Sequence, residues 1–233
     1  MDYKIDKDRV KEYFKNKTWY YNSIPEFEIL TASKDGLSEN EKSILSNRKI
    51  ELVNYIAELL ESEQIALAQD GEDYDIDRKP IDTIVIHHSG SSSSRASNPE
   101  TYINALELIM LYAPVFKSKK RDYGMWSGHF FNNKMTFIPY HYLIYKDGSF
   151  SNPLKDEYIG WHAGNWDVNT RSIAITFVDD LENREPTEMA ILTARDLIKK
   201  YPNAKLVGHS EVSPTVCPGN LFNIKGGWKD KLL

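Results

Sequence analysis

The stretch Thr83-Ile84-Val85-Ile86-His87-His88-Ser89 sets the interpretation of the rest of the chain. It starts with a short apolar run rich in β-branched side chains, a composition typical of a buried strand. The run ends in histidines, whose neutral imidazoles are common metal ligands. We therefore expect a core strand with a candidate ligand, His87, at its end.

Signals for strands and helices alternate after this run. An Asp147-Gly148 pair predicts a hairpin turn after one of the later strands. The expected strands are 140–145, 172–178 and 206–209, and the expected helices are 99–112 and 187–200. Strands that alternate with helices indicate an α/β layer structure with a central sheet.

The first part of the chain has a different pattern. A long helical pattern begins at Ser38, which can cap the helix, and Glu41 completes a capping box. An acidic, glycine-broken segment at 69–77 follows, and we interpret it as a solvated linker. We expect a mainly helical N-terminal extension of unknown role at 1–75 and a second domain at 76–233.

Composition and charge exclude some classes of protein. The 233 residues carry a net charge of −5, and the pI is about 5.7, so we expect no nucleic-acid partner. We expect no membrane span, because no apolar run reaches the length of about 18 residues that a span needs. The first residues lack the apolar core of a secretory signal. Synthesis in the cytosol is therefore expected, with export by another route left open, and the oligomeric state is not predicted.

The chain has a single cysteine, Cys217, within Gly208-His209-Ser210-Glu211-Val212-Ser213-Pro214-Thr215-Val216-Cys217-Pro218-Gly219. A lone thiol is inert core filler, a nucleophile or a metal ligand. A nucleophilic cysteine needs an orienting histidine and commonly an asparagine, and the sequence does not favour that arrangement. Two histidines and one thiolate suit Zn²⁺ and leave its fourth position open for water. The residues alone therefore favour a hydrolytic zinc site and leave the other two roles open.

Four blocks of the sequence, which lie between about 81 and 225, resemble a known family. They resemble the zinc-dependent type 2 N-acetylmuramoyl-L-alanine amidases, which include peptidoglycan recognition proteins and amidase-type phage lysozymes. All four occur in the order of the family. The blocks are Ile86-His87-His88-Ser89; Pro139-Tyr140-His141-Tyr142-Leu143-Ile144 with Lys146-Asp147-Gly148; Trp161-His162-Ala163-Gly164 with Asn169-Thr170-Arg171-Ser172-Ile173-Ala174-Ile175; and Gly208-His209 with Cys217-Pro218-Gly219.

The resemblance implies a fold and a set of site residues. The implied fold is a central mixed β-sheet flanked by helices. The implied zinc ligands are His87, His209 and Cys217, and the implied catalytic residues are Tyr140 and Thr215. Phage lysozymes have a lysine at the position of Thr215, whereas catalytic recognition proteins commonly have a threonine, so this chain is closer to the latter.

Further candidates concern substrate binding. By resemblance, His162 lines the substrate groove. Trp161, with Trp166, forms a sugar-stacking platform or packs in the core, and Asn169 braces the loop before the strand at 172–178.

Two other regions lie outside the motif blocks. A loop at about 113–137, which includes Trp126, is expected to contact glycan or peptide, or else to pack against the N-terminal region. His88 and His141 are expected to point away from their neighbours into the core, because side chains alternate along a strand.

The resemblance implies hydrolysis of the amide that joins the lactyl group of N-acetylmuramic acid to L-alanine in peptidoglycan. We expect a lysin that acts at the cell wall once released. The alternatives are a cytosolic amidase that recycles muropeptides and a module that binds peptidoglycan without cutting it. The presence of Cys217 favours catalysis, because non-catalytic members of such families typically lose a ligand.

Overall fold

The structure is a computed structural model and describes residues 4–68, 73–113, 129–131 and 134–233. It divides into two compact units, one of Met1–Asp73 with Ala96–Phe137 and one of Tyr74–Arg95 with Ile138–Leu233. The helix expected at 99–112 therefore belongs to the same unit as the N-terminal residues. The assignment of 76–233 to one domain remains a prediction.

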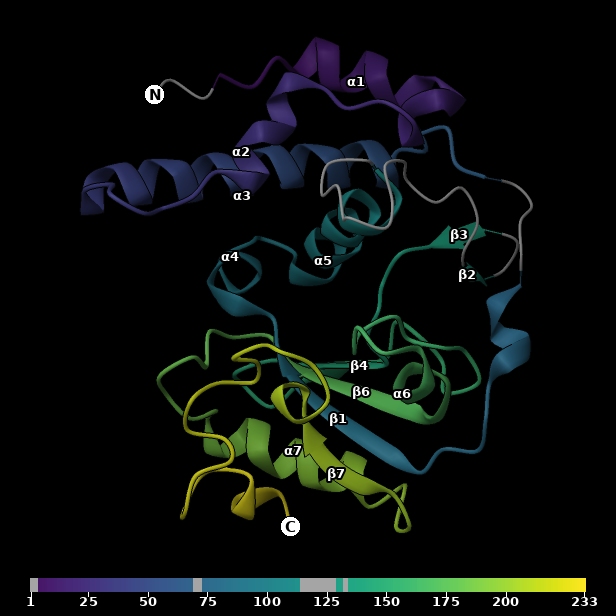
Figure 1. Cartoon of the computed structure of the whole chain (residues 1–233), viewed down its shortest axis with the longest axis vertical. Helices are drawn as coiled ribbons and strands as arrows, with labels where there is room; N and C mark the ends of the chain where they lie inside the picture. Colours follow the sequence, from purple (N-terminus) through teal and green to yellow (C-terminus); the bar gives the residue numbers. More distant parts are fainter. Residues whose placement is uncertain (1–3, 69–72, 114–128, 132–133) are drawn as a thin grey trace. The chain divides into compact units, whose positions relative to one another are not determined.

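The second unit is built on a five-stranded sheet (Figure 1). Its order is β5-β4-β6-β1-β7; β4, β6, β1 and β7 run parallel, and β5 pairs antiparallel with β4. The predicted α/β fold with a central mixed sheet is therefore confirmed. The strands are β1 (Thr83–His88), β4 (Tyr142–Ile144), β5 (Phe150–Ser151), β6 (Ser172–Phe177) and β7 (Lys205–Gly208).

Alternation along β1 gives the sheet two different faces. Ile84 and Ile86 belong to the apolar core that α7 (Glu188–Ile198) covers (Figure 1). Val85 belongs to a smaller cluster on the other face, together with residues of and near α6 (Trp166–Arg171). Because side chains alternate, His87 shares the face of Val85. The candidate site therefore lies on the face opposite α7.

Three local details of this unit differ from the sequence-based expectations or refine them. Tyr140 precedes β4, which is shorter than the expected strand at 140–145. The segment expected as a loop before β6 is the helix α6, which Asn165 caps by accepting a hydrogen bond from the N–H of Val168. Six residues are too few to show a helical period, so the sequence did not reveal α6. The hairpin turn at Asp147-Gly148 is confirmed, since Gly148 has a φ of +83° and β4 pairs with β5.

The acidic segment spans the boundary between the two units, and its last residues, Tyr74–Asp77, are held to the second unit at Asp75 while Ile76 stays exposed. Tyr74–Asp77 forms a 3-10 turn, and the carboxylate of Asp75 accepts a hydrogen bond from the N–H of Ile159 at 2.6 Å. The Arg78 guanidinium donates to the carbonyl of Asp156 at 2.8 Å. Charged side chains that find backbone partners are held in place, and composition alone could not reveal those partners.

The first unit is mainly helical, as predicted. Ser38 and Glu41 form the predicted capping box at the start of α3. The segment at 129–136, expected as a loop, contains a pair of antiparallel strands, and Trp126 lies outside the described residues. The elements are α1 (Lys7–Lys15), α2 (Glu28–Thr31), α3 (Glu39–Glu61), α5 (Pro99–Glu107), a π-helical turn (Leu108–Tyr112), β2 (His129–Phe131) and β3 (Lys134–Thr136). Among the helices that the structure describes, none combines the length and apolar character that a membrane crossing requires.

Candidate metal centre

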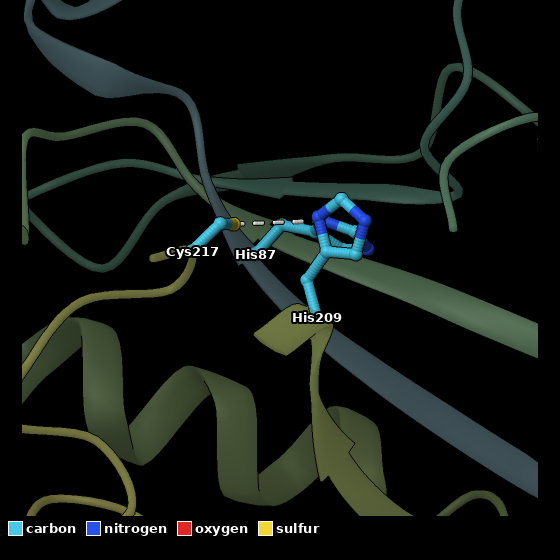
Figure 2. A group of neighbouring side chains, drawn as sticks. All are labelled: His87, His209 and Cys217. Carbon is cyan, nitrogen blue, oxygen red and sulfur yellow. Dashed lines mark hydrogen bonds between the residues drawn. The ribbon is translucent and has the colours of Figure 1, made fainter. Parts of the chain in front are cut away.

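Three side chains from separate segments converge at one end of the sheet (Figure 2). His87 lies in β1, His209 directly follows β7, and Cys217 lies in the loop beyond. Each offers one ligand atom, and these atoms all lie within 4.8 Å of one another. The Nδ1 of His87 lies 3.7 Å from the Sγ of Cys217, and the ring centres of His87 and His209 are 4.6 Å apart. The structure thus brings together the three residues that the sequence selected as ligands.

The register of the sheet explains why the two imidazoles meet. β1 and β7 run parallel, and Ile86 pairs with Gly208, so His87 and His209 follow side by side at the same end of the sheet. His87 is only 1% exposed, because its strand is central. A central strand is a rigid support, and catalytic groups need such support to hold their geometry.

The thiol reaches the imidazoles because the loop after His209 folds back on itself. The N–H of Ser210 donates to the carbonyl of Cys217 at 2.7 Å, and the N–H of His88 donates to the Sγ of Cys217 at 3.4 Å. Gly219 has a φ of +129°, and a Cβ there would lie 1.9 Å from the carbonyl oxygen of Leu181. Only a glycine allows this approach, which fixes the position of the loop that carries Cys217.

We expect Gly219→Ala to destabilise the protein more than Gly226→Ala. Both glycines have a positive φ, where an L-residue costs about 1–2 kcal/mol, but a Cβ at Gly226 would meet nothing within 4 Å. The clash with Leu181 should add at least about 1 kcal/mol to the loss of unfolding free energy in Gly219→Ala. Urea denaturation of both variants measures the difference, and equal losses would contradict the packing argument.

Burial controls the protonation of the candidate ligands. Burial lowers the pKa of His87 well below 6.5, and the neighbouring imidazoles of His162 and His209 lower it further. Burial also lowers the pKa of His209, whereas it raises the pKa of the Cys217 thiol to about 12. The imidazoles are therefore neutral and able to bind a metal, while the thiol has to lose its proton when it becomes a ligand.

We expect the stability of the metal-free protein to fall as the pH drops below about 6.5. The pKa values of His87 and His162 are both lowered, mainly by burial, so the unfolded chain takes up protons that the folded chain excludes. Each imidazole contributes a slope of at most about 1.4 kcal/mol per pH unit to the unfolding free energy. Urea denaturation at about pH 7.5 and about pH 5.5 tests this expectation. His162→Asn removes one of the two groups and should lower the slope, and a flat profile in the parent would be inconsistent with two buried neutral imidazoles.

The donor set fits a zinc ion. Two nitrogens and one sulfur match the ligands that Zn²⁺ prefers, and a tetrahedral ion holds such atoms about 3.3–3.6 Å apart. The separation of 3.7 Å between His87 and Cys217 is close to this distance. The Nε2 of His209 is buried and has no hydrogen-bond partner in the described part of the chain. A buried polar atom without a partner is costly, and a metal ion in this cluster would give the donor set a common partner.

The two predicted catalytic residues lie beside this cluster. Tyr140 is half-buried, and the centre of its ring lies 5.2 Å from that of His87. Thr215 is exposed, and its Oγ1 accepts a hydrogen bond from the N–H of Cys217 at 3.2 Å. Each of these residues therefore contacts a candidate ligand or its backbone.

The three predicted substrate-binding residues have different surroundings. The imidazole of His162 is buried behind His87, with its Nδ1 2.9 Å from the Nε2 of His87. Asn169 is also buried and accepts a hydrogen bond from the N–H of Ala163 at 2.8 Å, so it braces this backbone from within α6. Trp161 packs edge-on against Tyr74 and Trp166. The structure therefore brings His162 to the metal cluster and places Asn169 in a backbone contact.

Two hydroxyl residues near the cluster were missed from the sequence. The Oγ of Ser172 lies 3.1 Å from the Nε2 of His162. Thr176 pairs with His87 in the sheet, and its buried Oγ1 has no hydrogen-bond partner among the described residues. Both lie on the same face of β6 as Ala174. Small and polar residues that alternate with large apolar ones along β6 were the signal that could have revealed them.

A mixed sheet with two imidazoles and one thiol at the end of its parallel strands defines an α/β protein with a candidate hydrolytic metal centre. The sequence profile of the family described as N-acetylmuramoyl-L-alanine amidase, Amidase_2, matches residues 77–220, which is more than half of the chain. The chain belongs to this family.

Individual relatives include recognition proteins and a lysin. A peptidoglycan-recognition protein of Drosophila simulans is 29% identical over 157 residues, which cover 64% of this chain and 75% of that protein. Peptidoglycan recognition protein 4 of Mus musculus is 35% identical over 112 residues, or 42% of this chain and 29% of that protein. The endolysin of Escherichia phage T7 is 29% identical over 101 residues, or 40% of this chain and 64% of that protein. The chain thus spans less than two thirds of the last two proteins.

Solved structures of amidases and recognition proteins also resemble the chain. The N-acetylmuramoyl-L-alanine amidase LysC from Clostridium intestinale URNW has a TM-score of 0.45 and 22% identity, with 71% of this chain and 93% of that chain covered. Drosophila PGRP-LB has a TM-score of 0.44 and 22% identity, with 66% of this chain and 82% of that chain covered.

Proposed function

We propose that the chain is a zinc-dependent N-acetylmuramoyl-L-alanine amidase that hydrolyses the lactyl–L-alanine amide of peptidoglycan. The observation that carries this proposal is the convergence of His87, His209 and Cys217 within a chain that belongs to an amidase family. Three protein ligands leave a fourth coordination position open, which is typical of catalytic zinc rather than structural zinc. When bound, zinc supplies a Lewis acid for the scissile carbonyl and lowers the pKa of water from about 15.7 to about 7.

Two residues of the chain are proposed to stabilise charge on the substrate. Attack on the amide places negative charge on its carbonyl oxygen, and a hydrogen-bond donor aimed at that oxygen accelerates the step. The phenol of Tyr140 lies beside His87 and can donate such a bond. The hydroxyl of Thr215 accepts from the N–H of Cys217, so its own proton stays available for the same oxyanion.

Two carboxylates near these motifs have other partners. Glu211 accepts hydrogen bonds from the N–H of Gly208 at 2.7 Å and from the ammonium of Lys229 at 2.9 Å. Asp147 accepts from the N–H of Ser149 within the hairpin turn. Both serve local structure, and we assign neither of them as the acid that protonates the leaving amine.

We propose that the protein is a lysin, which cleaves peptidoglycan at the cell wall. The match to the endolysin of Escherichia phage T7 supports this role, and the matches to recognition proteins support peptidoglycan or muropeptides as the ligand. In this proposal Trp161 contributes directly to the substrate side of the site. Asn169 supports it through the backbone of Ala163, and His162 acts through its contact with His87.

The decisive experiment measures new amino groups released from purified peptidoglycan by the full chain. We expect release in the presence of zinc, loss of release after chelation and recovery when zinc is restored. Binding to peptidoglycan without release would instead support a recognition module. Release from soluble muropeptides but not from the polymer would support a recycling amidase.

A further inference from the structure

We propose that His162 is a positioning residue that fixes the tautomer and the ring orientation of His87, and that Ser172 completes the hydrogen-bond chain behind it. The inference rests on the proposed zinc site. It gives His162 a role behind the metal ligand, away from any sugar or peptide.

The contacts form a continuous buried chain. The Nε2 of His87 lies 2.9 Å from the Nδ1 of His162, and the Nε2 of His162 lies 3.1 Å from the Oγ of Ser172. These residues are 1%, 6% and 0% exposed, respectively, so water does not compete for the bonds. Within the described part of the chain, His162 is the only hydrogen-bond partner of the Nε2 of His87.

The positions of the N–H protons on the two imidazoles explain why the contact between His87 and His162 matters. A neutral imidazole carries one N–H, and only a ring nitrogen with a lone pair binds a metal. The Nδ1 of His87 faces Cys217, so the proton of His87 has to lie on Nε2 and be donated to the Nδ1 of His162. His162 then carries its own proton on Nε2 and donates it to the Oγ of Ser172. The opposite arrangement would put a proton on the Nδ1 of His87 and block metal binding there.

The imidazole of His162, which accepts the bond from His87, is also held in place. Gly160 packs against His162, and a Cβ on Gly160 would lie 3.0 Å from the Cδ2 of His162 and 2.3 Å from the carbonyl oxygen of Pro139. Ser172 is fixed in β6, where it pairs with Thr83. Partners that orient a metal-bound histidine in this way typically change metal affinity by about 10–100-fold when they are removed.

Two substitutions of His162 separate its acceptor role from its packing role. His162→Phe keeps a ring but removes the acceptor, and we expect it to weaken zinc binding by about 10–100-fold. His162→Asn keeps an acceptor oxygen at about the position of Nδ1, and it should retain most of the affinity. Competition with a chromophoric zinc chelator measures the dissociation constant without any assay of amidase activity.

A matched control tests for general damage to the fold. His141 is another buried histidine; its Nδ1 accepts a hydrogen bond from the N–H of Ala174 at 3.0 Å, and its Nε2 lies 3.0 Å from the carbonyl oxygen of Tyr158. His141→Phe should destabilise the protein as His162→Phe does and should leave zinc affinity unchanged. Circular dichroism confirms that each variant is folded before zinc is titrated.

The tautomer itself provides a second readout. Nitrogen-15 NMR of the zinc-loaded parent should show His87 protonated on Nε2, and a proton on Nδ1 would overturn the proposal. So would a folded His162→Phe that binds zinc as tightly as the parent. If His162→Phe does not fold, zinc binding by Ser172→Ala tests the proposal instead. We expect this variant to bind zinc severalfold more weakly than the parent, and an unchanged zinc affinity would refute the proposed role of the hydrogen bonds behind His87. A parent that binds no zinc would instead refute the proposed function.

Discussion

Cys217→Ala is expected to lower zinc affinity by at least about a thousandfold and to abolish amidase activity. It removes one of three ligands, and the loss of an outer partner of a ligand alone costs about 10–100-fold. The remaining imidazoles of His87 and His209 form an incomplete site. Because Cys217 is the only cysteine of the chain, a thiol reagent reports on this position alone.

The measurement combines zinc titration with thiol labelling. In the metal-free parent, burial already slows the reaction of Cys217 by raising the pKa of its thiol, and zinc should slow the reaction further, since a metal-bound thiolate is not free to react. The matched control is Val216→Ala, which changes the neighbouring side chain of the same loop, 56% exposed, and should leave both affinity and activity intact. Full activity in Cys217→Ala would show that the sulfur is not required and would contradict the proposed set of two imidazoles and one thiolate.

Tyr140→Phe is expected to retain zinc and to lower kcat by about 10²–10³-fold. The substitution removes only the phenol oxygen, and the ring can keep its place beside His87. A donor that acts on the oxyanion stabilises the transition state more than the substrate, so KM should change little. This separation of metal binding from turnover distinguishes Tyr140 from the ligands.

Kinetics on a soluble muropeptide, with zinc content measured for the same samples, test this expectation. Thr215→Val is the companion variant, because it removes the second proposed donor at nearly constant volume, and we expect a smaller loss of kcat. A Tyr140→Phe enzyme that loses its zinc would make Tyr140 part of the metal-binding site. One with unchanged kcat would exclude the proposed role in catalysis.

The sequence was sufficient to predict the core strands of the sheet because they are short segments rich in β-branched and apolar side chains. Residues 83–87 of β1 and all of Ser172–Phe177 are buried, as expected of segments with this composition. The capping box of Ser38 and Glu41 depends on residues three positions apart, so it was equally visible. Features set by local sequence were therefore accessible before the structure.

Features that depend on contacts between residues far apart in the sequence could not be predicted. The bond between His87 and His162 joins residues 75 positions apart, and neither spacing nor composition encodes it. The same holds for Asp75, whose carboxylate is held by the N–H of Ile159 and whose acidic neighbours had suggested a linker. The candidate ligands could be named from motifs, but their supports required the tertiary structure.

The strand order has a consequence for how the centre assembles during synthesis. β1, β4 and β6 are neighbours in the interior of the sheet, and all three precede β7, which lies at its edge. A nascent chain can therefore pair these strands before the ribosome has delivered His209 or Cys217. The apolar core beneath α7 also includes Leu206, Phe222 and Trp228, which belong to or follow β7, so this core and the proposed metal centre are completed by the same late part of the chain.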